Sequence, residues 1–422
     1  MGGMTSIGAD GYTFSALNPA TAGTLVATTF QVSGHGTRLA LSEEGYGDFA
    51  VANTGGVGPM DLVFKRNGGK NALMLGVHPA LQTGYAITQT VDDPEAGAVE
   101  KTYDGIGGLS MAHIGLSRSL RSSRFVAAGE NDSIAIQGTQ LHIGGQVRYL
   151  FGSVERTSRL DIFDPSFLDN RTMTSLQHRA AGWGAGLVLD QLLVARYNKN
   201  RDFENSVSLR LSFAAEGTDS LTTDYRRIAG NTQTFGGVIT QVDTAFYAAF
   251  EAQSALPIGL HAGLGLMFDH ANGRQLTVGV EWKQRDWASM NADASGIAWM
   301  GSGWAWGKEQ TLSTGIQWKP GNAEQRHPFW GVATYRAGFA QSTLPLVREE
   351  SGSALEAWKV TAGLSVPMRG SRSASKLHFG MEFGKRQMDD GIGLQEQLTS
   401  VHFGFTLNPF FKNIWLTPRL YD

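Results

Sequence analysis

The chain lacks cysteine altogether, although it is 422 residues long. This absence excludes disulfides, thiol catalysis and thiolate metal sites. Charged residues are scarce as well, at 17% of the chain against about 25% in an average soluble protein. The sequence also has no run approaching 18 consecutive apolar residues, which excludes a membrane-spanning helix. It does not exclude a protein that crosses the membrane with β-strands, because apolar and polar residues alternate along such strands and the average hydropathy stays low.

The patterns that mark common binding and catalytic sites are missing too. The 35 basic and 38 acidic side chains give a formal net charge of −3 with no block of one sign, so we expect no nucleic acid partner. The histidines show no His-x-x-x-His spacing, and no complete nucleophile elbow is present. We therefore predict no catalytic residue, no metal site, no cofactor and no enzymatic activity.

Glycine and aromatic residues, by contrast, are abundant, with 54 glycines and 22 phenylalanines. Many lie in runs that alternate between two faces. Residues 258–268 carry Ile, Leu, Ala or Phe at every even position, and 275–283 alternate again after an Asn272-Gly273 hairpin turn. Similar runs occur at 206–213, 358–366, 376–383 and 401–407, and less regular ones at 71–90, 103–119, 138–153 and 179–197. We predict an all-β chain of about 14 strands.

Two architectures fit long antiparallel strands with one apolar face. A soluble sandwich buries that face between two sheets, whereas a transmembrane barrel turns it toward lipid. Several runs reach the 9 to 11 residues that cross a bilayer, so the antiparallel transmembrane β-barrel is favoured. The polar faces would then line the lumen. We expect four histidines there, paired with Asp or Glu: His142, His261, His378 and His402.

The opening, "MGGMTSIGADGYTFSALNPATAG", is too broken by glycine to be a secretory signal. We therefore expect that residues preceding Met1 have been removed. Its "GG", "DG" and "LNPA" elements resemble the start of the outer membrane long-chain fatty acid transporter (FadL-type) superfamily, in a Bacteroidetes-like branch. "NALMLGVHPALQTGYAITQT" and the C-terminal "LNPFFKNIWLTPRLYD" are similar to later parts of that family.

The resemblance implies a Gram-negative outer membrane barrel of 14 strands. Residues 1–23 would form a hatch in the lumen, 24–410 the barrel, and 411–422 a C-terminal tail. Hydrophobic, fatty-acid-like molecules would pass by diffusion through the plugged lumen and a lateral gate. The expected partners are outer membrane lipid around the barrel and a hydrophobic small molecule, or detergent, in the lumen. The alternative is a docking or structural partner in an outer membrane secretion or surface-assembly complex, similar to type IX secretion.

The predicted hatch residues are Phe14, Leu17, Asn18 and Pro19. A barrel of 14 strands is wide enough to leave a channel unless something fills it, and the apolar side chains of this segment could do so. The alternative is that Asn18-Pro19 is a plain turn before the first strand.

The predicted lateral gate consists of Gly76, His78, Pro79 and Gly84. Proline cannot donate to a strand ladder, so Pro79 predicts a break in the wall, which is tolerated at membrane depth where it lines a cavity or opening. The alternative places Pro79 in a loop just outside the membrane.

Overall fold

The structure is a computed structural model that describes residues 1–408, except 44–46, 67, 128–132, 165, 199, 201, 236–237, 291–302, 322–328 and 369–374. The predicted tail at 411–422 lies outside these residues. Among the described residues, no helix is long and apolar enough to cross a membrane.

A single antiparallel sheet closes on itself, because β1 pairs with both β2 and β18. The strands are β1 (Thr29–Glu43), β2 (Gly47–Lys65), β3 (Asn71–Asp93), β4 (Gly97–Ala127), β5 (Ser133–Ile162), β6 (Asp169–Tyr197), β7 (Phe203–Thr218), β8 (Leu221–Phe235), β9 (Val238–Gln241), β10 (Phe246–Ser254), β11 (Gly259–His270), β12 (Gln275–Asp286), β13 (Trp304–Trp306), β14 (Lys308–Lys319), β15 (Thr334–Arg348), β16 (Ala354–Pro367), β17 (Lys376–Met388) and β18 (Leu394–Leu407). One short helix, α1 (Thr21–Thr24), precedes them.

These segments form a barrel of 14 strands, which confirms the predicted fold class. Three wall strands consist of two segments each, namely β7 with β8, β10 with β11, and β13 with β14. The register shows this: β6 pairs with β7 along its lower half and with β8 along its upper half. β9 pairs only with the end of β8 in the described sheet.

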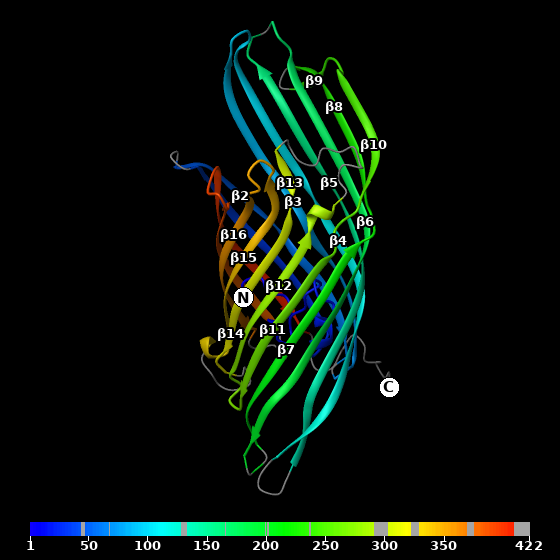
Figure 1. Ribbon diagram of the computed structural model, residues 1–422, viewed down its shortest axis with the longest axis vertical. Coiled ribbons are helices and arrows are strands. Elements are labelled where there is room, and N and C mark those ends of the chain that lie inside the picture. The colour runs from blue at the N-terminus through cyan, green and yellow to red at the C-terminus, as the bar shows by residue number, and fades with distance from the viewer. Residues whose placement is uncertain are drawn as a thin grey trace, which may run out of the picture.

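The wall has two unequal sides (Figure 1). β4, β5 and β6 contain 31, 30 and 29 residues, several times the 9 to 11 that cross a bilayer. Together with β3, β8 and β10 they rise far above the rest in the figure, and we call these six strands the tall wall. β12 and β14–β18, with 12 to 15 residues each, form the short wall.

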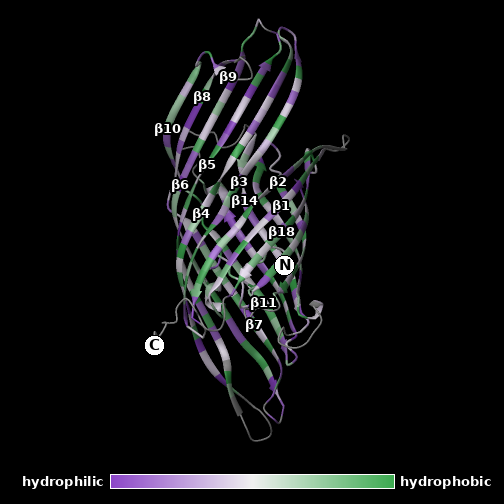
Figure 2. Ribbon diagram, turned by 180° about the vertical axis from the view of Figure 1, so that it is seen from behind, coloured by the Kyte–Doolittle hydropathy of each residue, from purple (hydrophilic) through white to green (hydrophobic). Residues whose placement is uncertain are grey.

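Hydrophobic and hydrophilic residues alternate along the strands, as the sequence predicts (Figure 2). Large apolar side chains are exposed on the outside, such as Ile114 at 57% and Phe403 at 56%. Trp318 stacks near Tyr335 at the lower end of this apolar belt, with ring centroids 5.7 Å apart, as interfacial aromatic residues do. Closed barrels with such a belt are typical of bacterial outer membranes, and this barrel supports the predicted location in the outer membrane of a Gram-negative bacterium.

Candidate functional site

Residues 1–28, the N-terminal segment, lie inside the barrel, since their partners come from the inner faces of strands all around the wall. β1 begins at Thr29, and the predicted hatch bounds of 1–23 stay a prediction. Its first residues lie along a row of four glycines that pair directly across β11, β12, β14 and β15: Gly265, Gly279, Gly315 and Gly338. A Cβ on any of them would press against the segment, mostly at Ile7 or Met1–Gly2. The glycine row therefore shapes the inner wall to fit it.

On the short-wall side, a buried carboxylate binds the segment. Glu281 of β12 is 3% exposed and accepts hydrogen bonds from the backbone N–H groups of Thr5, Ser6 and Ile7 at 2.6–2.8 Å. Such charge-assisted bonds are about twice as strong as neutral ones. Three adjacent amides on one carboxylate fix both the position and the direction of the chain.

A second charged contact binds the next part of the segment to the short wall. Nζ of Lys376 donates to Oδ2 of Asp10 at 2.6 Å, and Nη2 of Arg336 lies 3.5 Å from the same oxygen. The side chain of Asp10 is 6% exposed. Removing one partner of a buried pair is strongly destabilising, so this contact also favours one position of the segment.

The tall-wall strands hold the later residues through backbone carbonyls. Gln146 and Arg148 of β5 both donate to the carbonyl oxygen of Ala16, at 2.6 and 2.7 Å. Farther along, the hydroxyl of Ser119 on β4 donates to the carbonyl of Gly23, and so does the ammonium of Lys65 on β2, outside the tall wall. These donors satisfy carbonyl groups in α1 and just before it, which have few partners within so short a helix.

The predicted hatch residues lie within this segment. Phe14 is 6% exposed and packs in one cluster with Val63 of β2 and Met74 of β3. Asn18 donates to the hydroxyl of Ser6 at 2.9 Å and accepts a bond from the N–H of Ala20, which turns the chain into α1. Pro19 is buried and Leu17 is half-buried. Their role as a hatch stays a prediction.

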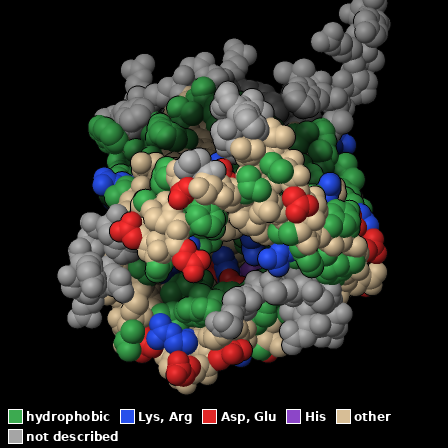
Figure 3. Space-filling model, turned by 90° about the horizontal axis from the view of Figure 1, so that it is seen from above, with side chains coloured by type: hydrophobic (Ala, Val, Ile, Leu, Met, Phe, Trp, Pro, Cys, Tyr) green, Lys and Arg blue, Asp and Glu red, His purple; other side chains and the backbone are tan. Residues whose placement is uncertain are grey.

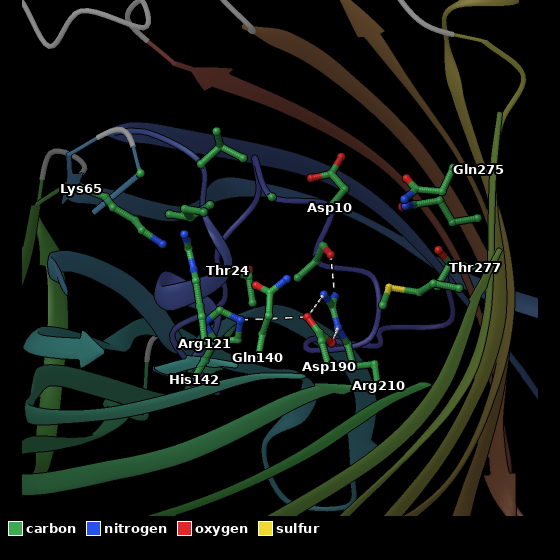
Figure 4. Close-up of a pocket in the computed structure, with 17 residues that line it drawn as sticks. Asp10, Thr24, Lys65, Arg121, Gln140, His142, Asp190, Arg210, Gln275 and Thr277 are labelled. Carbon is green, nitrogen blue, oxygen red and sulfur yellow. Dashed lines mark hydrogen bonds and ion pairs between the residues drawn. The ribbon is translucent and has the colours of Figure 1, made fainter. Parts of the chain in front are cut away.

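Below the segment, the lumen contains a cavity of about 420 Å³ (Figure 4). Arg210 binds Asp190 through two parallel bonds of 2.6 and 2.8 Å and also donates to the carbonyl of Ala9. His142 lies 4.0 Å from Asp190, and Lys65 lines the opposite side. Charged side chains are also visible in the central hollow from the upper end (Figure 3). The cavity is therefore suited to water and polar groups.

The other lumenal histidines find different partners. His261 lies 3.6 Å from Glu216, in line with the expectation that these histidines pair with carboxylates. His378 instead binds the hydroxyls of Ser365 and Thr406, and His402 packs against His35 with ring centroids 6.0 Å apart. For these two the predicted Asp or Glu partner is wrong, because the register places hydroxyls or another imidazole opposite them.

Between β2 and β3 the ladder is short. In the described residues the two strands pair from Met60 opposite Val77 to Lys65 opposite Ala72. Above that point β2 continues along β1 and β3 along β4, and the two hairpins diverge (Figure 1). We call residues 47–59 and 78–93 the seam. The side-chain amide of Gln82 reaches across it to the carbonyl of Gly55 at 3.4 Å.

The predicted gate residues lie at the base of the seam or along it. Pro79 is inside β3, at a register shift against β4 between Pro79 and Leu81. Gly76 is opposite Asp61 in the last part of the ladder, and Nε2 of His78 lies 2.6 Å from Oδ1 of Asp61. Gly84 lies higher, with open space where a Cβ would stand. The structure brings these residues to one edge, and their role as a gate stays a prediction.

A largely apolar cavity of about 390 Å³ lies beside the segment and is lined by β1, β17 and β18 together with Thr13 and Phe14. Phe14 lines it from the inside, and Phe403 and Phe405 belong to its wall. Sequence reasoning did not indicate this cavity, nor the roles of Glu281 and Asp61. Both carboxylates fall on polar faces or near turns like many others, and only the register of distant strands distinguishes them.

Comparisons with known proteins place this geometry among known barrels. The CymD monoaromatic hydrocarbon channel shares 13% identity, with 97% of this chain and 95% of that chain covered and a TM-score of 0.50. A TodX monoaromatic hydrocarbon channel deltaS2 mutant shares 15%, with 93% of each chain covered and a TM-score of 0.50. A Pseudomonas aeruginosa FadL homologue shares 13%, with 93% of each covered and a TM-score of 0.46. No curated protein matches the chain.

At these identities the likeness concerns the fold, and the resemblance to FadL-type barrels is confirmed at that level. The Bacteroidetes-like branch stays a prediction. A family model described as BamG matches residues 1–422. Since that match spans the whole sequence, the chain belongs to the BamG family.

Proposed function

We propose that this chain is a docking and structural component of an outer membrane assembly, a barrel with its lumen closed by the N-terminal segment. Its partner would be another outer membrane protein that contacts the tall wall. We assign the upper end to the cell exterior, because bacterial barrels keep short turns at the periplasmic end and carry their longer extensions outside.

The observation that carries this proposal is the pair of unpaired edges on the tall wall. In the described residues, β3 above Val77 pairs with β4 alone, and β10 pairs with β8 alone. A strand edge offers a row of N–H and C=O groups on which another chain can pair. Strands that extend so far beyond the bilayer are not needed for a membrane pore, and they give a partner a large surface.

The side chains near one edge suit a protein partner. Phe246, Tyr247 and Phe250 of β10 are 49%, 59% and 38% exposed. Arg226 and Arg227 of β8 lie over the first two of these rings, with the guanidinium carbon about 6 Å from each ring centroid. Aromatic residues and arginine are enriched in protein interfaces.

The interior supports the same proposal. Buried charges hold the N-terminal segment against both walls, through Glu281 and Asp10 on one side and Arg148 on the other. The cavity of about 420 Å³ beneath it is lined mainly by charged and polar side chains, with Leu25, Val26 and Met267 among them. A hydrophobic molecule would have to displace these contacts and enter a polar space at a cost in free energy.

A photo-crosslinking experiment in the native outer membrane tests this function. The crosslinking amino acid is placed at Tyr85 or Tyr247 on the edges of the tall wall, and at Trp358 on the short wall as a control. We expect one defined protein adduct from the tall-wall sites and none from Trp358. Equal labelling of lipid alone at all three sites would contradict a docking role.

The second candidate function is passage of hydrophobic small molecules, and the seam is the observation that favours it. Pro79 and the unpaired stretch of β3 lie where a lateral exit would have to be, and proteins of similar fold are named as hydrocarbon channels. Uptake of a radiolabelled hydrocarbon by cells carrying Pro79→Ala, or a deletion of residues 1–20, tests it. If the chain transports hydrocarbons, uptake should change in both variants. If it only docks a partner, Pro79→Ala should leave uptake unchanged.

A further inference from the structure

Three ionisable side chains from three different strands meet at the base of the seam. Asp61 comes from β2, His78 from β3 and His113 from β4, and each offers one ligand atom within 4.8 Å of the others. Nε2 of His78 lies 2.6 Å from Oδ1 of Asp61, and Nε2 of His113 lies 3.5 Å from the same oxygen. The two imidazole rings meet edge to face, with centroids 5.0 Å apart.

The cluster is buried, and one of its members lacks a hydrogen-bond partner. The side chains of Asp61, His78 and His113 are 1%, 12% and 0% exposed. Within the described residues, neither ring nitrogen of His113 makes a hydrogen bond. Leaving a buried polar group unpaired is unfavourable. A ligand bound to this ring would satisfy it.

We propose that Asp61, His78 and His113 form a site for a divalent transition-metal ion such as Zn²⁺. Two imidazoles and one carboxylate are a ligand set that such ions prefer, with metal–ligand distances of about 2.0–2.2 Å. Ligand atoms of a tetrahedral site lie about 3.3 Å apart at these distances, so the 2.6 Å Asp61–His78 contact would have to widen by roughly 0.7 Å to admit the ion. Gly76 keeps the space open, because a Cβ there would collide with the Asp61 carboxylate and with the His113 ring.

An outer partner orients the carboxylate, as is usual for metal ligands. Nε2 of Gln31 donates to Oδ2 of Asp61 at 2.7 Å and to the carbonyl of Phe14 at 2.8 Å. Oδ1 is left facing the two histidines. Gln31 therefore connects the site to the N-terminal segment, so that binding of an ion would affect the contacts of that segment.

The location gives the ion a structural effect. Asp61 and Gly76 are opposite each other one residue below the last β2–β3 pair. An ion held by β2, β3 and β4 together would cross-link the wall at the point where the ladder ends. It would limit how far the seam can widen, whichever of the two candidate functions the barrel performs.

Titration calorimetry with Zn²⁺ on the purified full chain in detergent, without an affinity tag, tests the site. We expect one ion per chain. His113→Gln should weaken binding by more than the roughly 10- to 100-fold typical of an outer partner, and Gln31→Ala by roughly 10-fold. His178→Gln is the matched control, because His178 is a buried histidine whose ring binds the hydroxyl of Thr223. The Zn²⁺ affinity of His178→Gln should equal that of the wild type.

Heat-modifiable gel mobility shows which variants remain folded, and His78→Gln provides a second variant if His113→Gln does not fold. In the folded wild type, Co²⁺ should produce a visible absorption band that Zn²⁺ abolishes and that folded His78→Gln or His113→Gln does not show. Equal Zn²⁺ affinity in wild type and a folded ligand variant would overturn the site. So would the absence of binding by the wild type.

Discussion

The two walls of the barrel differ in length and in what they hold. The short wall hardly exceeds the bilayer, and its charged groups bind residues 5–10 of the N-terminal segment through Glu281, Lys376 and Arg336. The tall wall holds residues 16–23 near its base and then extends far beyond the membrane, with two edges that have no strand partner in the part of the chain that the structure describes. The comparison separates a part of the molecule that closes the lumen from a part that is free to contact other molecules.

Removing the top of the tall wall should have the largest effect on association. Replacing residues 88–102 with Asn-Gly joins Ile87 to Tyr103, which are already paired across β3 and β4. The membrane-embedded wall remains, so we expect the barrel to fold while the tall-wall crosslinks to a partner disappear. Native gel electrophoresis of outer membranes measures the loss of the assembly. Retention of the full assembly would show that the top of the β3–β4 hairpin is not needed for docking.

Glu281→Ala should release the start of the N-terminal segment from the short wall. Each hydrogen bond to a charged group contributes about 1.5–3 kcal/mol, and this carboxylate accepts bonds from three successive amides. We expect faster proteolysis within residues 1–10 and a higher ion conductance in planar bilayers. Tall-wall crosslinking should be unchanged.

Glu382→Ala is the control for that variant. Glu382 also faces the lumen from the short wall, but its partner is Lys359 on the neighbouring strand at 3.1 Å. It should leave proteolysis of the segment as in the wild type. If both substitutions raise the conductance equally, the effect comes from the lumen charge and not from anchoring.

Gly279→Ala should have a smaller effect of the same kind. The added Cβ would collide with the side chain of Ile7, and overpacking of this type costs about 1–3 kcal/mol. Gly363→Ala, in the same wall, meets its nearest atom at an ordinary 3.4 Å and should be neutral. Limited proteolysis of the segment compares the two. Identical rates would mean that the glycine row does not determine how the segment fits.

The sequence predicts the short wall better than the tall wall, and the bilayer explains why. Where a strand has lipid on one side and the lumen on the other, its side chains must alternate, as in residues 376–383 of β17. Above the membrane both faces meet water and this requirement ends. The irregular runs at 103–119 and 138–153 therefore indicated strands, but not that β4 and β5 extend over 31 and 30 residues.

The candidate site was predictable only in part, because its residues lie far apart along the chain. Pro79 and His78 stand out locally, since proline is unusual inside a strand. Asp61 and His113 lie 17 residues before and 35 after His78, on other strands, so no local spacing relates them. Their meeting depends on the register of β2, β3 and β4, which is set by pairing along whole strands.

The smallest effect is expected for an exposed charge on the tall wall, and its comparison with a lumenal charge on β7 tests whether exposure decides how much a charge stabilises the barrel. Arg179 pairs with Asp224 and Glu251 at 2.7 Å, but its side chain is 46% exposed, and such surface pairs contribute less than about 1 kcal/mol. Arg210, at 6% exposed in the lumen, binds Asp190 and the carbonyl of Ala9, and loss of a buried partner costs about 3–5 kcal/mol. Thermal unfolding of Arg179→Ala and Arg210→Ala at low and high salt should show a small, screened loss for the first and a large, salt-insensitive loss for the second. Equal losses would mean that exposure does not separate the two charges, and that the charges of the tall wall help to hold its long strands together.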